Sequence, residues 1–343
     1  MSKRIGLLTG GGDCPGLNPA IRGCVMRGLD YGFECIGILE GWRGLVEGAT
    51  QPITLQDVKE IVGKGGTLLG TSRTNPFKKE GAVAKCLDNV KKLQLDALVA
   101  MGGEDTLGVA AKFFKEHQLP VVGVPKTMDN DLSATDYTFG FDTATTIAVD
   151  AAERLRDTGR SHRRIMILEV MGRHAGWVAF FTAIASAADG VLLPEREVDF
   201  KALCVHLKKV HARDHTALVI TSEAVKLPGV TVEKEELDQF GHMLLKKRGV
   251  GDTLAEMIDK ETGIETRAAV IGHIQRGGAP TLFDRILATR VGVKAADMVA
   301  AGDFGKMVAL RGNEVKAVSL EEATAKLKIV TPDWLKLADT FFK

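Results

Sequence analysis

The chain has 343 residues, 45% of them hydrophobic, so it can bury a sizeable core, and its length is typical of roughly two domains. Its 45 lysines and arginines nearly balance its 44 aspartates and glutamates, which removes the electrostatic basis for a polyanionic partner such as nucleic acid. The five cysteines are scattered and form no C-x-x-C pair, so neither a disulfide framework nor a cysteine-based zinc site is indicated.

Short apolar runs alternate along the chain with glycine-rich turns and helix-like stretches. The first such unit is residues 4–9, the turn GGGDCPGLN at 10–18 and a helix to about residue 31. Alternation of buried strands with helices predicts an α/β fold with doubly wound, largely parallel, Rossmann-like sheets. Further strands are expected over residues 97–101, 121–124, 165–170, 217–221 and 268–271, with helices over 106–116, 145–155 and within 175–188.

Around residues 139–146 the chain leaves the first run of units and enters a long helix, which favours a domain crossing there. We therefore expect two domains with the active site in the cleft between them. Residues 225–263 are charged and are expected to form a mostly helical, surface-exposed insertion that contributes little core. The predicted division is 1–139 plus 274–325 for the larger domain and 140–273 plus 326–343 for the smaller.

No segment is predicted to cross a membrane. The apolar N-terminal run breaks at Thr9, and the longest uncharged run, residues 175–188, is too short to span a bilayer. Unpaired cysteines fit a reducing compartment, so a cytoplasmic protein is expected.

Two neighbouring motifs place carboxylates beside groups that can hold phosphate: MGGEDTLG at 101–108 and PKTMDND at 125–131. Each follows an apolar run, so their polar residues should emerge where strands end, which is where open α/β sheets bind ligands. The glycine turn at 10–12 could bind phosphate through backbone N–H groups, or it could simply form a turn.

Asp129 and Asp131 lie two residues apart, so in an extended segment they face the same way and could converge on one metal or one reacting hydroxyl. Phosphoryl transfer needs a base, Mg²⁺ and cations for the developing charge. Asp129 is the candidate base, Glu104 a metal-side carboxylate, and Lys126 and Arg173 the candidate cations. Alternatively, the D-N-D segment is only an Asx-rich turn that caps the next element.

Six motifs together resemble one family. GGGDCPGLN, GTSR at 70–73, GGEDT, PKTMDND, MGRHAG at 171–176 and GHIQRGG at 272–278 occur in the order and approximate spacing of the phosphofructokinases. The resemblance covers nearly the whole chain outside the insertion. It implies a larger domain that binds the phosphoryl donor, a smaller domain that binds fructose 6-phosphate, Mg²⁺ as cofactor, and a homodimer or homotetramer.

The resemblance also implies residue roles. Asp129 would accept the proton of the 1-hydroxyl of fructose 6-phosphate with Thr127 beside it, Arg173 would stabilise the transferring group, and Lys126 completes the catalytic set. Arg164 and Arg267 are supplied across a subunit interface in the family, and arginines suit a phosphate dianion because their planar forks bond it bidentately. The implied sugar-phosphate positions are Thr127, Asp129, Arg164, Met171, Gly172, Arg173, Glu223, Arg267, His273 and Arg276.

Two positions indicate the phosphoryl donor. ATP users of the family typically carry glycine at both, whereas pyrophosphate users resemble this chain, with Asp105 and Lys126. A carboxylate where the nucleotide α-phosphate must pass adds bulk and like-charge repulsion, and Lys126 supplies charge for a shorter donor. Alternatively, the two side chains only form an ion pair, which would still fill the pocket. The implied donor-site residues are Gly11, Gly12, Arg73, Asp105 and Lys126.

The predicted function is therefore a reversible, pyrophosphate-dependent 6-phosphofructokinase of glycolysis and gluconeogenesis. The alternatives are an ATP-dependent phosphofructokinase, an NAD or lipid kinase, against which PKTMDND and GHIQRGG count, and a non-catalytic sugar-phosphate sensor. Glu104 stands where the family more usually has Asp, which makes its reach to Mg²⁺ one methylene longer. His206, His211 and His215 include an i,i+4 pair, but no carboxylate or cysteine completes a zinc site.

Overall fold

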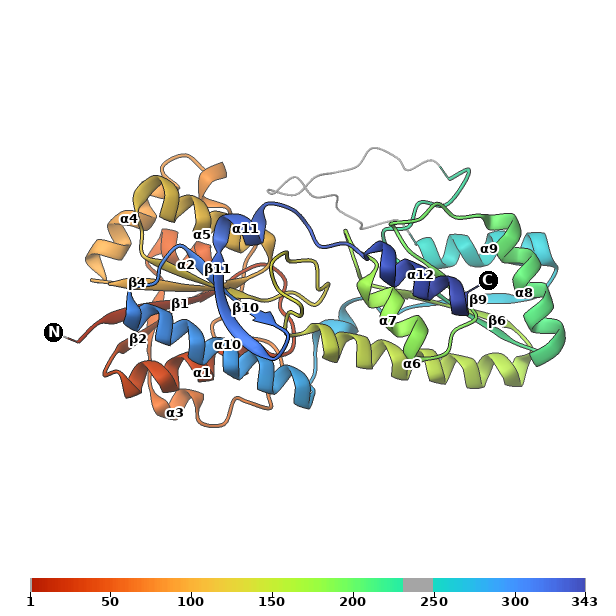
Figure 1. Ribbon diagram of the computed structural model, residues 1–343, viewed down its shortest axis with the longest axis horizontal. Helices are drawn as coiled ribbons and strands as arrows, with labels where there is room; N and C mark the ends of the chain where they lie inside the picture. Colours follow the sequence, from red (N-terminus) through yellow and green to blue (C-terminus); the bar gives the residue numbers. More distant parts are fainter. Residues whose placement is uncertain (1, 231–248, 343) are drawn as a thin grey trace.

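The computed structural model describes residues 2–230 and 249–342, and over these residues the chain forms two α/β lobes, each built on one sheet (Figure 1). In the first lobe the seven-stranded sheet is parallel except at its edges, where the outermost strand on each side is antiparallel to its neighbour. Its strands, in spatial order, are β11 (Glu314–Ser319), β10 (Lys306–Arg311), β5 (Val121–Pro125), β4 (Ala97–Gly102), β1 (Arg4–Thr9), β2 (Glu34–Ile38) and β3 (Thr50–Ile53).

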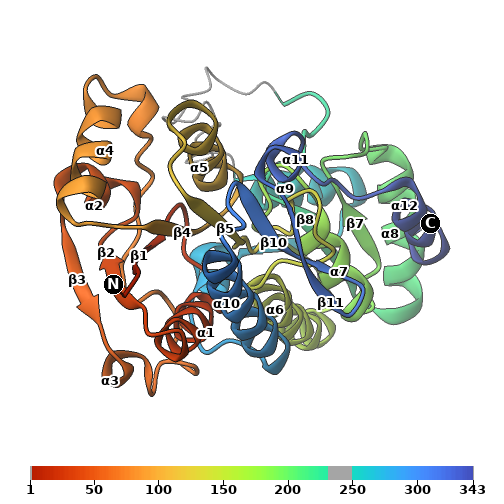
Figure 2. The same cartoon turned by 60° about the vertical axis from the view of Figure 1, so that its left-hand side comes forward.

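Helices cover both faces of this sheet, which explains why its central strands β4 and β5 are buried along their whole length (Figure 2). The closest helix pair on one face is α1 with α10, where Gly23 and Gly292 let the two backbones approach, because a Cβ at either position would meet main-chain atoms of the other helix. One face carries α1 (Leu17–Asp30), α3 (Leu55–Val58) and α10 (Leu282–Ala301), and the other carries α2 (Trp42–Glu47), η1 (Pro76–Lys78), α4 (Ala82–Lys92), α5 (Glu104–His117) and α11 (Leu320–Thr324).

The second lobe is a four-stranded, fully parallel sheet with helices on both faces. Its strands, in spatial order, are β7 (Gly190–Leu192), β8 (Ala217–Ser222), β6 (Ile165–Val170) and β9 (Thr266–Val270). One face carries α6 (Phe141–His162) and α7 (Trp177–Ala185), on which α12 (Pro332–Phe341) packs, and the other carries α8 (Phe200–Asp214) and α9 (Val250–Thr262). Two parallel-dominated sheets with helices on both faces confirm the predicted fold class.

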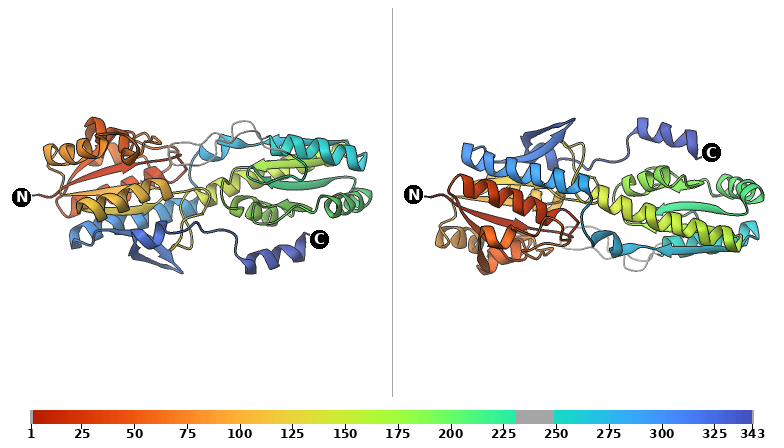
Figure 3. Two further views of the ribbon diagram at one scale, coloured as in Figure 1. Left: turned by 90° about the horizontal axis from the view of Figure 1, so that it is seen from above. Right: turned by 90° about the horizontal axis from the view of Figure 1, so that it is seen from below.

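The chain crosses between the lobes three times within the described residues. It enters the second lobe with α6, returns through η2 (Gly272–Arg276) into α10, and leaves the first lobe again after α11 to reach α12 (Figures 1 and 3). The proposed division at 139/140, 273/274 and 325/326 keeps each sheet within one unit. No helix among residues 2–230 and 249–342 combines the length and apolarity needed to cross a bilayer.

The prediction that residues 225–263 contribute little core is wrong for α9. This helix packs into the core beneath the second sheet, because its apolar residues recur at helical spacing on one face despite the surrounding charges. The central part of the predicted insertion, residues 231–248, lies outside the described residues. The buried apolar side chains of α9 are Val250, Leu254, Ala255 and Ile258.

Several strands were not predicted: β2, β3, β7, β10 and β11. β7 spans only three residues, and the edge strand β11 carries charged residues that break the apolar pattern. The structure also starts α5 at Glu104 instead of residue 106 and extends α6 well beyond 145–155 in both directions. The helix α5 therefore carries Glu104 and Asp105 in its first turn, where the helix dipole stabilises negative charge.

A buried carboxyl joins the two lobes at the start of α6. Asp284 of α10 is fully buried, and its Oδ2 accepts hydrogen bonds from the backbone N–H and the hydroxyl of Thr143, at 2.8 and 2.6 Å. Burial raises the pKa of Asp284 from 3.8 to about 6, although the bonds from Thr143 oppose this. The folded protein therefore holds a proton on this group over a pH range where the unfolded chain has lost it.

We expect Asp284→Asn to remove this pH dependence. As pH rises from about 4 to 6, the wild type should lose up to about 3 kcal/mol of stability that the asparagine variant retains. The melting temperature of the variant relative to wild type should then rise over that window and stay level above it. Asp150→Asn is the control, because the hydrogen bond from Arg154 lowers the pKa of Asp150; an identical rise there would contradict the assignment.

Candidate active site

One pocket forms where strands of both sheets end. The first lobe contributes the turn after β1, the first turn of α5 and the segment after β5, and the second lobe contributes the loops after β6 and β8. All of these are carboxyl ends of parallel strands, where an open α/β sheet presents its ligand site. The pocket is lined by Gly11, Gly12, Arg73, Gly103, Glu104, Asp105, Thr106, Lys126, Thr127, Met128, Asp129, Asp131, Met171, Arg173, His174, Glu223 and Arg276.

Hydrogen bonds with residues 71 and 72 hold the glycine turn that follows β1. The N–H of Gly11 donates to the carbonyl of Ser72 at 3.0 Å, and the hydroxyl of Thr71 donates to the carbonyl of Gly11 at 2.6 Å. Gly11 has φ of 80°, which favours glycine, and a Cβ at Gly12 would collide with the guanidinium of Arg276. The turn is therefore fixed in place and lies directly against an arginine of the other motif, GHIQRGG.

Lys126 lies between this turn and the D-N-D segment. It is 3% exposed, and its ammonium donates to the carbonyl of Gly12. Burial lowers the pKa of Lys126, and the charge of Arg276 acts in the same direction, whereas the carboxylates of Asp13 and Asp129 oppose it. In such a pocket the buried ammonium can attract an anionic ligand, and the carboxylates can attract a metal ion bound to that ligand.

The D-N-D segment forms a tight turn in which the asparagine does the capping. Asn130 adopts φ of 51°, and its side-chain oxygen accepts the N–H of Thr138 at 3.1 Å. The hydroxyl of Thr127 accepts the N–H of Asp129 and donates to Asp131, both at 3.1 Å. Among the described residues, Asp129 Oδ1 is buried and has no hydrogen-bond partner. The turn thus leaves one aspartate oxygen available for a ligand, which the capping interpretation does not explain.

The carboxyl groups in the pocket repel one another. Burial and then the charge of Asp129 raise the pKa of Asp131 to about 7, and Glu104 adds a smaller push in the same direction. Burial and then Asp129 also raise the pKa of Glu223. Burial and neighbouring negative charge therefore both disfavour ionisation of these carboxyls, a common property of sites that bind cations or exchange protons.

The second lobe closes the pocket with the loop after β6. The N–H of Met171 donates to the side-chain oxygen of Gln275 at 2.9 Å, and the N–H of Gly172 donates to Glu223 at 3.3 Å. Gln275 is fully buried and also donates to the carbonyl of Ala144 in α6, so it fixes this loop to the helix that joins the lobes. Sequence reasoning did not select Gln275, although it lies within the GHIQRGG motif.

Four predicted residues do not line the pocket. Gly172 contacts the pocket indirectly, because its N–H donates to the lining residue Glu223. His273 is exposed in η2. Arg164 and Arg267 lie at the amino ends of β6 and β9, where both pair with Glu265, at 2.9 and 2.7 Å. The pocket also contains four residues to which the sequence assigned no role, all of them within the quoted motifs: Gly103, Thr106, Met128 and His174.

The family model described as phosphofructokinase matches residues 4–299. The chain belongs to the phosphofructokinase family. It is 54% identical to the pyrophosphate--fructose 6-phosphate 1-phosphotransferase of Dictyoglomus thermophilum, over 100% of this chain and 99% of the relative. It is 43% identical to the ATP-dependent 6-phosphofructokinase of Mycobacterium leprae, over 99% of both chains. The crystal structure of the pyrophosphate-dependent phosphofructokinase from Nitrosospira multiformis has a TM-score of 0.84 with 19% identity, over 97% of this chain and 87% of that chain, which shows a shared fold.

The carboxylates of this phosphofructokinase pocket fit Mg²⁺. Glu104, Asp129 and Asp131 line one cavity, and burial together with the charge of Asp129 raises the pKa of Asp131, which a bound divalent cation would oppose. No group of three or more His, Cys, Asp or Glu that could hold a metal occurs among the described residues. Mg²⁺ needs no such cage, because it usually takes one or two carboxylates and completes its shell with substrate phosphates and water.

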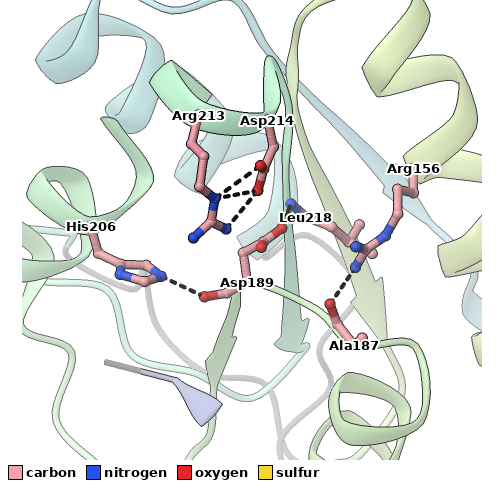
Figure 4. Close-up of polar contacts among 7 residues, drawn as sticks. All are labelled: Arg156, Ala187, Asp189, His206, Arg213, Asp214 and Leu218. Atoms are coloured by element: carbon pink, nitrogen blue, oxygen red, sulfur yellow. Dashed lines mark hydrogen bonds and ion pairs between the residues drawn. The ribbon is translucent and has the colours of Figure 1, made fainter. Parts of the chain in front are cut away.

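The histidines of α8 make structural contacts instead. The ring of His206 lies 2.9 Å from the carbonyl oxygen of Asp189, whose side chain accepts the N–H of Leu218 at 2.8 Å (Figure 4). His211 similarly contacts the carbonyl of Arg163 at 2.8 Å. These two contacts hold α8 against the residues that precede β7 and β6.

Proposed function

We propose that the chain is a phosphotransferase that moves a phosphoryl group from pyrophosphate to the 1-hydroxyl of fructose 6-phosphate, giving fructose 1,6-bisphosphate and phosphate. The observation that carries the proposal is the buried Oδ1 of Asp129, which has no hydrogen-bond partner among the described residues and lies in a pocket that also holds Lys126 and Arg173. A base beside cations is what phosphoryl transfer to a hydroxyl needs. We place the reaction in cytoplasmic glycolysis and gluconeogenesis. It is reversible because pyrophosphate and the product differ little in the free energy of phosphoryl transfer.

Asp129 acts on the acceptor sugar. Its carboxylate takes the proton of the 1-hydroxyl as the sugar oxygen bonds to phosphorus, and the bond between phosphorus and the bridging oxygen of pyrophosphate breaks to release phosphate. Thr127 supports this role, because its hydroxyl accepts the N–H of Asp129 and so fixes the backbone that carries the base. Lys126 and Arg173 offset the negative charge that spreads over the transferring group. Mg²⁺, when bound near Glu104, supplies further positive charge to the phosphate oxygens.

The sugar phosphate lies on the second-lobe side of the pocket in this proposal. Met171, Arg173 and Glu223 line that side, and Glu223 is suited to accept sugar hydroxyls. Arg276, whose guanidinium lies against Gly12, would contact the sugar phosphate from the first-lobe side. Gly172 keeps Glu223 in place through its N–H. Arg164 and Arg267 lie outside the pocket and would serve the site of a neighbouring copy in a homodimer or homotetramer. His273, three residues before Arg276 in η2, would hold the sugar phosphate.

The donor is proposed from two side chains. Asp105 stands in the first turn of α5, and Lys126 follows β5; both line the same pocket as the proposed donor residues Gly11, Gly12 and Arg73. A carboxylate at Asp105 disfavours the additional phosphate of a nucleotide, and the buried ammonium of Lys126 favours a compact, highly charged donor. The pyrophosphate-dependent relative, which has the higher identity of the two relatives described above, supports the same donor.

The test is turnover of fructose 6-phosphate with Mg²⁺ and either pyrophosphate or ATP as the sole donor. Turnover with pyrophosphate and little with ATP is expected, together with phosphate-dependent cleavage of fructose 1,6-bisphosphate in reverse. A clear preference for ATP would reject the donor assignment and leave the acceptor assignment intact. Binding of fructose 6-phosphate without turnover on either donor would favour the sensor.

A further inference from the structure

The last crossing between the lobes contacts the chain segment that follows β5, which also lines the pocket. Residues 326–331, which we call the strap, connect α11 to α12 and lie along the turn that follows PKTMDND. The N–H of Lys328 donates to the carbonyl of Asp131 at 2.7 Å, and the hydroxyl of Ser133 donates to the carbonyl of Lys326 at 2.6 Å. Leu327 and Leu132 form an isolated antiparallel bridge. The strap therefore pairs with the backbone that carries the proposed base.

The same strap also contacts the second lobe. The indole N–H of Trp177, the first residue of α7, donates to the carbonyl of Lys328 at 2.9 Å. Glu195 accepts the N–H of Val330 at 3.0 Å and the N–H of Gly176 at 2.8 Å. Gly176 ends the MGRHAG loop that carries Arg173, so the strap is bonded directly to the turn after β5 and is connected to this loop through Glu195.

The side chain of Lys328 makes the most direct connection. Its ammonium donates to the side-chain oxygen of Asn130 at 3.0 Å and to the carbonyls of Thr135 and Asp136 at 3.0 and 2.9 Å. Burial lowers the pKa of Lys328 to about 8, with the Arg311 charge acting in the same direction and the Asp136 and Asp131 charges opposing it. The ammonium is therefore still mostly protonated at neutral pH, and its three protons match three acceptors.

Asn130 is the residue through which this contact reaches the chemistry. It sits between Asp129 and Asp131 in a left-handed conformation that is uncommon for a side-chain-bearing residue. Its side-chain oxygen accepts both from Lys328 and from the N–H of Thr138, so two donors hold it in that conformation. Losing one of them should loosen the turn and displace Asp129 from the acceptor hydroxyl.

We propose that Lys328 is a positioning residue for the phosphoryl-transfer reaction: through Asn130 it holds Asp129 in place, and through its backbone it joins that turn to the start of α7, directly after the loop that carries Arg173. This inference rests on the proposed function of the pocket. Lys328 touches no substrate. Displacement of a catalytic group by about 1 Å can cost on the order of 100-fold in rate, so the effect should appear in kcat.

The test compares Lys328→Met with Lys326→Met, an exposed lysine of the same strap whose side chain makes none of these contacts. Two readouts are used: steady-state kinetics with the better donor, and hydrogen exchange of residues 126–138 measured by mass spectrometry. Lys328→Met should lower kcat by about 10- to 100-fold, leave the KM for fructose 6-phosphate within about threefold, and speed exchange in that segment. Lys326→Met should change neither.

A second variant separates positioning from a general loss of folding. Asn130→Gly removes the acceptor and tolerates the left-handed backbone, so it should reproduce the kcat loss, and the double variant should lose no more than either single variant. Unchanged exchange in Lys328→Met, faster exchange without a fall in kcat, or additive losses in the double variant would each overturn the proposal. If the wild type turns over no sugar phosphate, the proposed function fails, and with it the catalytic part of this inference; the exchange data still report whether Lys328 orders the turn.

Discussion

Replacing Asp129 by asparagine is expected to lower kcat by about 10²- to 10⁴-fold while leaving the dissociation constant for fructose 6-phosphate nearly unchanged. The amide keeps the size of the side chain and can keep its place in the turn, but it cannot take the proton of the attacking hydroxyl. The buried Oδ1, which has no hydrogen-bond partner among the described residues, is the atom that the substitution disables. Initial rates give kcat, and isothermal titration with fructose 6-phosphate alone gives the affinity.

The control for this variant is Asp150→Asn, an exposed aspartate on α6 that pairs with Arg154. It should leave both quantities unchanged. Turnover of Asp129→Asn at the wild-type rate would remove Asp129 from the role of base. Loss of sugar-phosphate affinity in parallel with kcat would instead point to a role for Asp129 in binding.

Lys126→Met is expected to lower kcat/KM for pyrophosphate by about 10²- to 10³-fold. Methionine fills nearly the same volume, so the buried site stays packed, but the positive charge beside Gly12 and the transferring group is lost. The affinity for fructose 6-phosphate should change much less, because Lys126 lies on the donor side of the pocket. Steady-state kinetics with each substrate varied in turn measures both effects.

An exposed lysine of α4 provides the matched control, since Lys92→Met removes a charge far from the pocket. Asp105→Gly tests the other half of the donor argument in the same assay, and it should raise the ratio of ATP to pyrophosphate turnover by about tenfold or more. If both Lys126→Met and Asp105→Gly left the donor preference as in the wild type, other residues would have to select the donor.

Much of the first and second sheets could be predicted from the sequence because their central strands are uninterrupted apolar runs. β1 and β6 begin and end at the predicted residues. The edge strand β11 could not be predicted in this way, because charged residues alternate with apolar ones along it. β10 has a buried run of only four residues, 307–310, between charged ends, and it was missed. The prediction was wrong for α9 because charged residues on its exposed side obscure the helical spacing of its buried apolar residues.

The pocket residues were identified by motif, since their chemical types and spacing are visible in the sequence, and the fold then brings the motifs to one edge. Residues that act through geometry left no such signal. Gln275 is one residue of a motif, and its bonds to Met171 and Ala144 depend on two elements far apart in the chain. Lys328 lies outside every motif, so only the path of the strap reveals its contacts.

The three crossings between the lobes have a consequence for synthesis on the ribosome. Within the described residues, all strands of the second sheet have been made by Val270, whereas β5 of the first sheet gains its neighbour β10 only when Lys306–Arg311 emerge. The sheet that begins first is therefore completed last, and the nascent chain must carry an open, apolar strand edge while the second sheet folds. Chaperone dependence of the newly made chain should accordingly be greatest between these two points of translation.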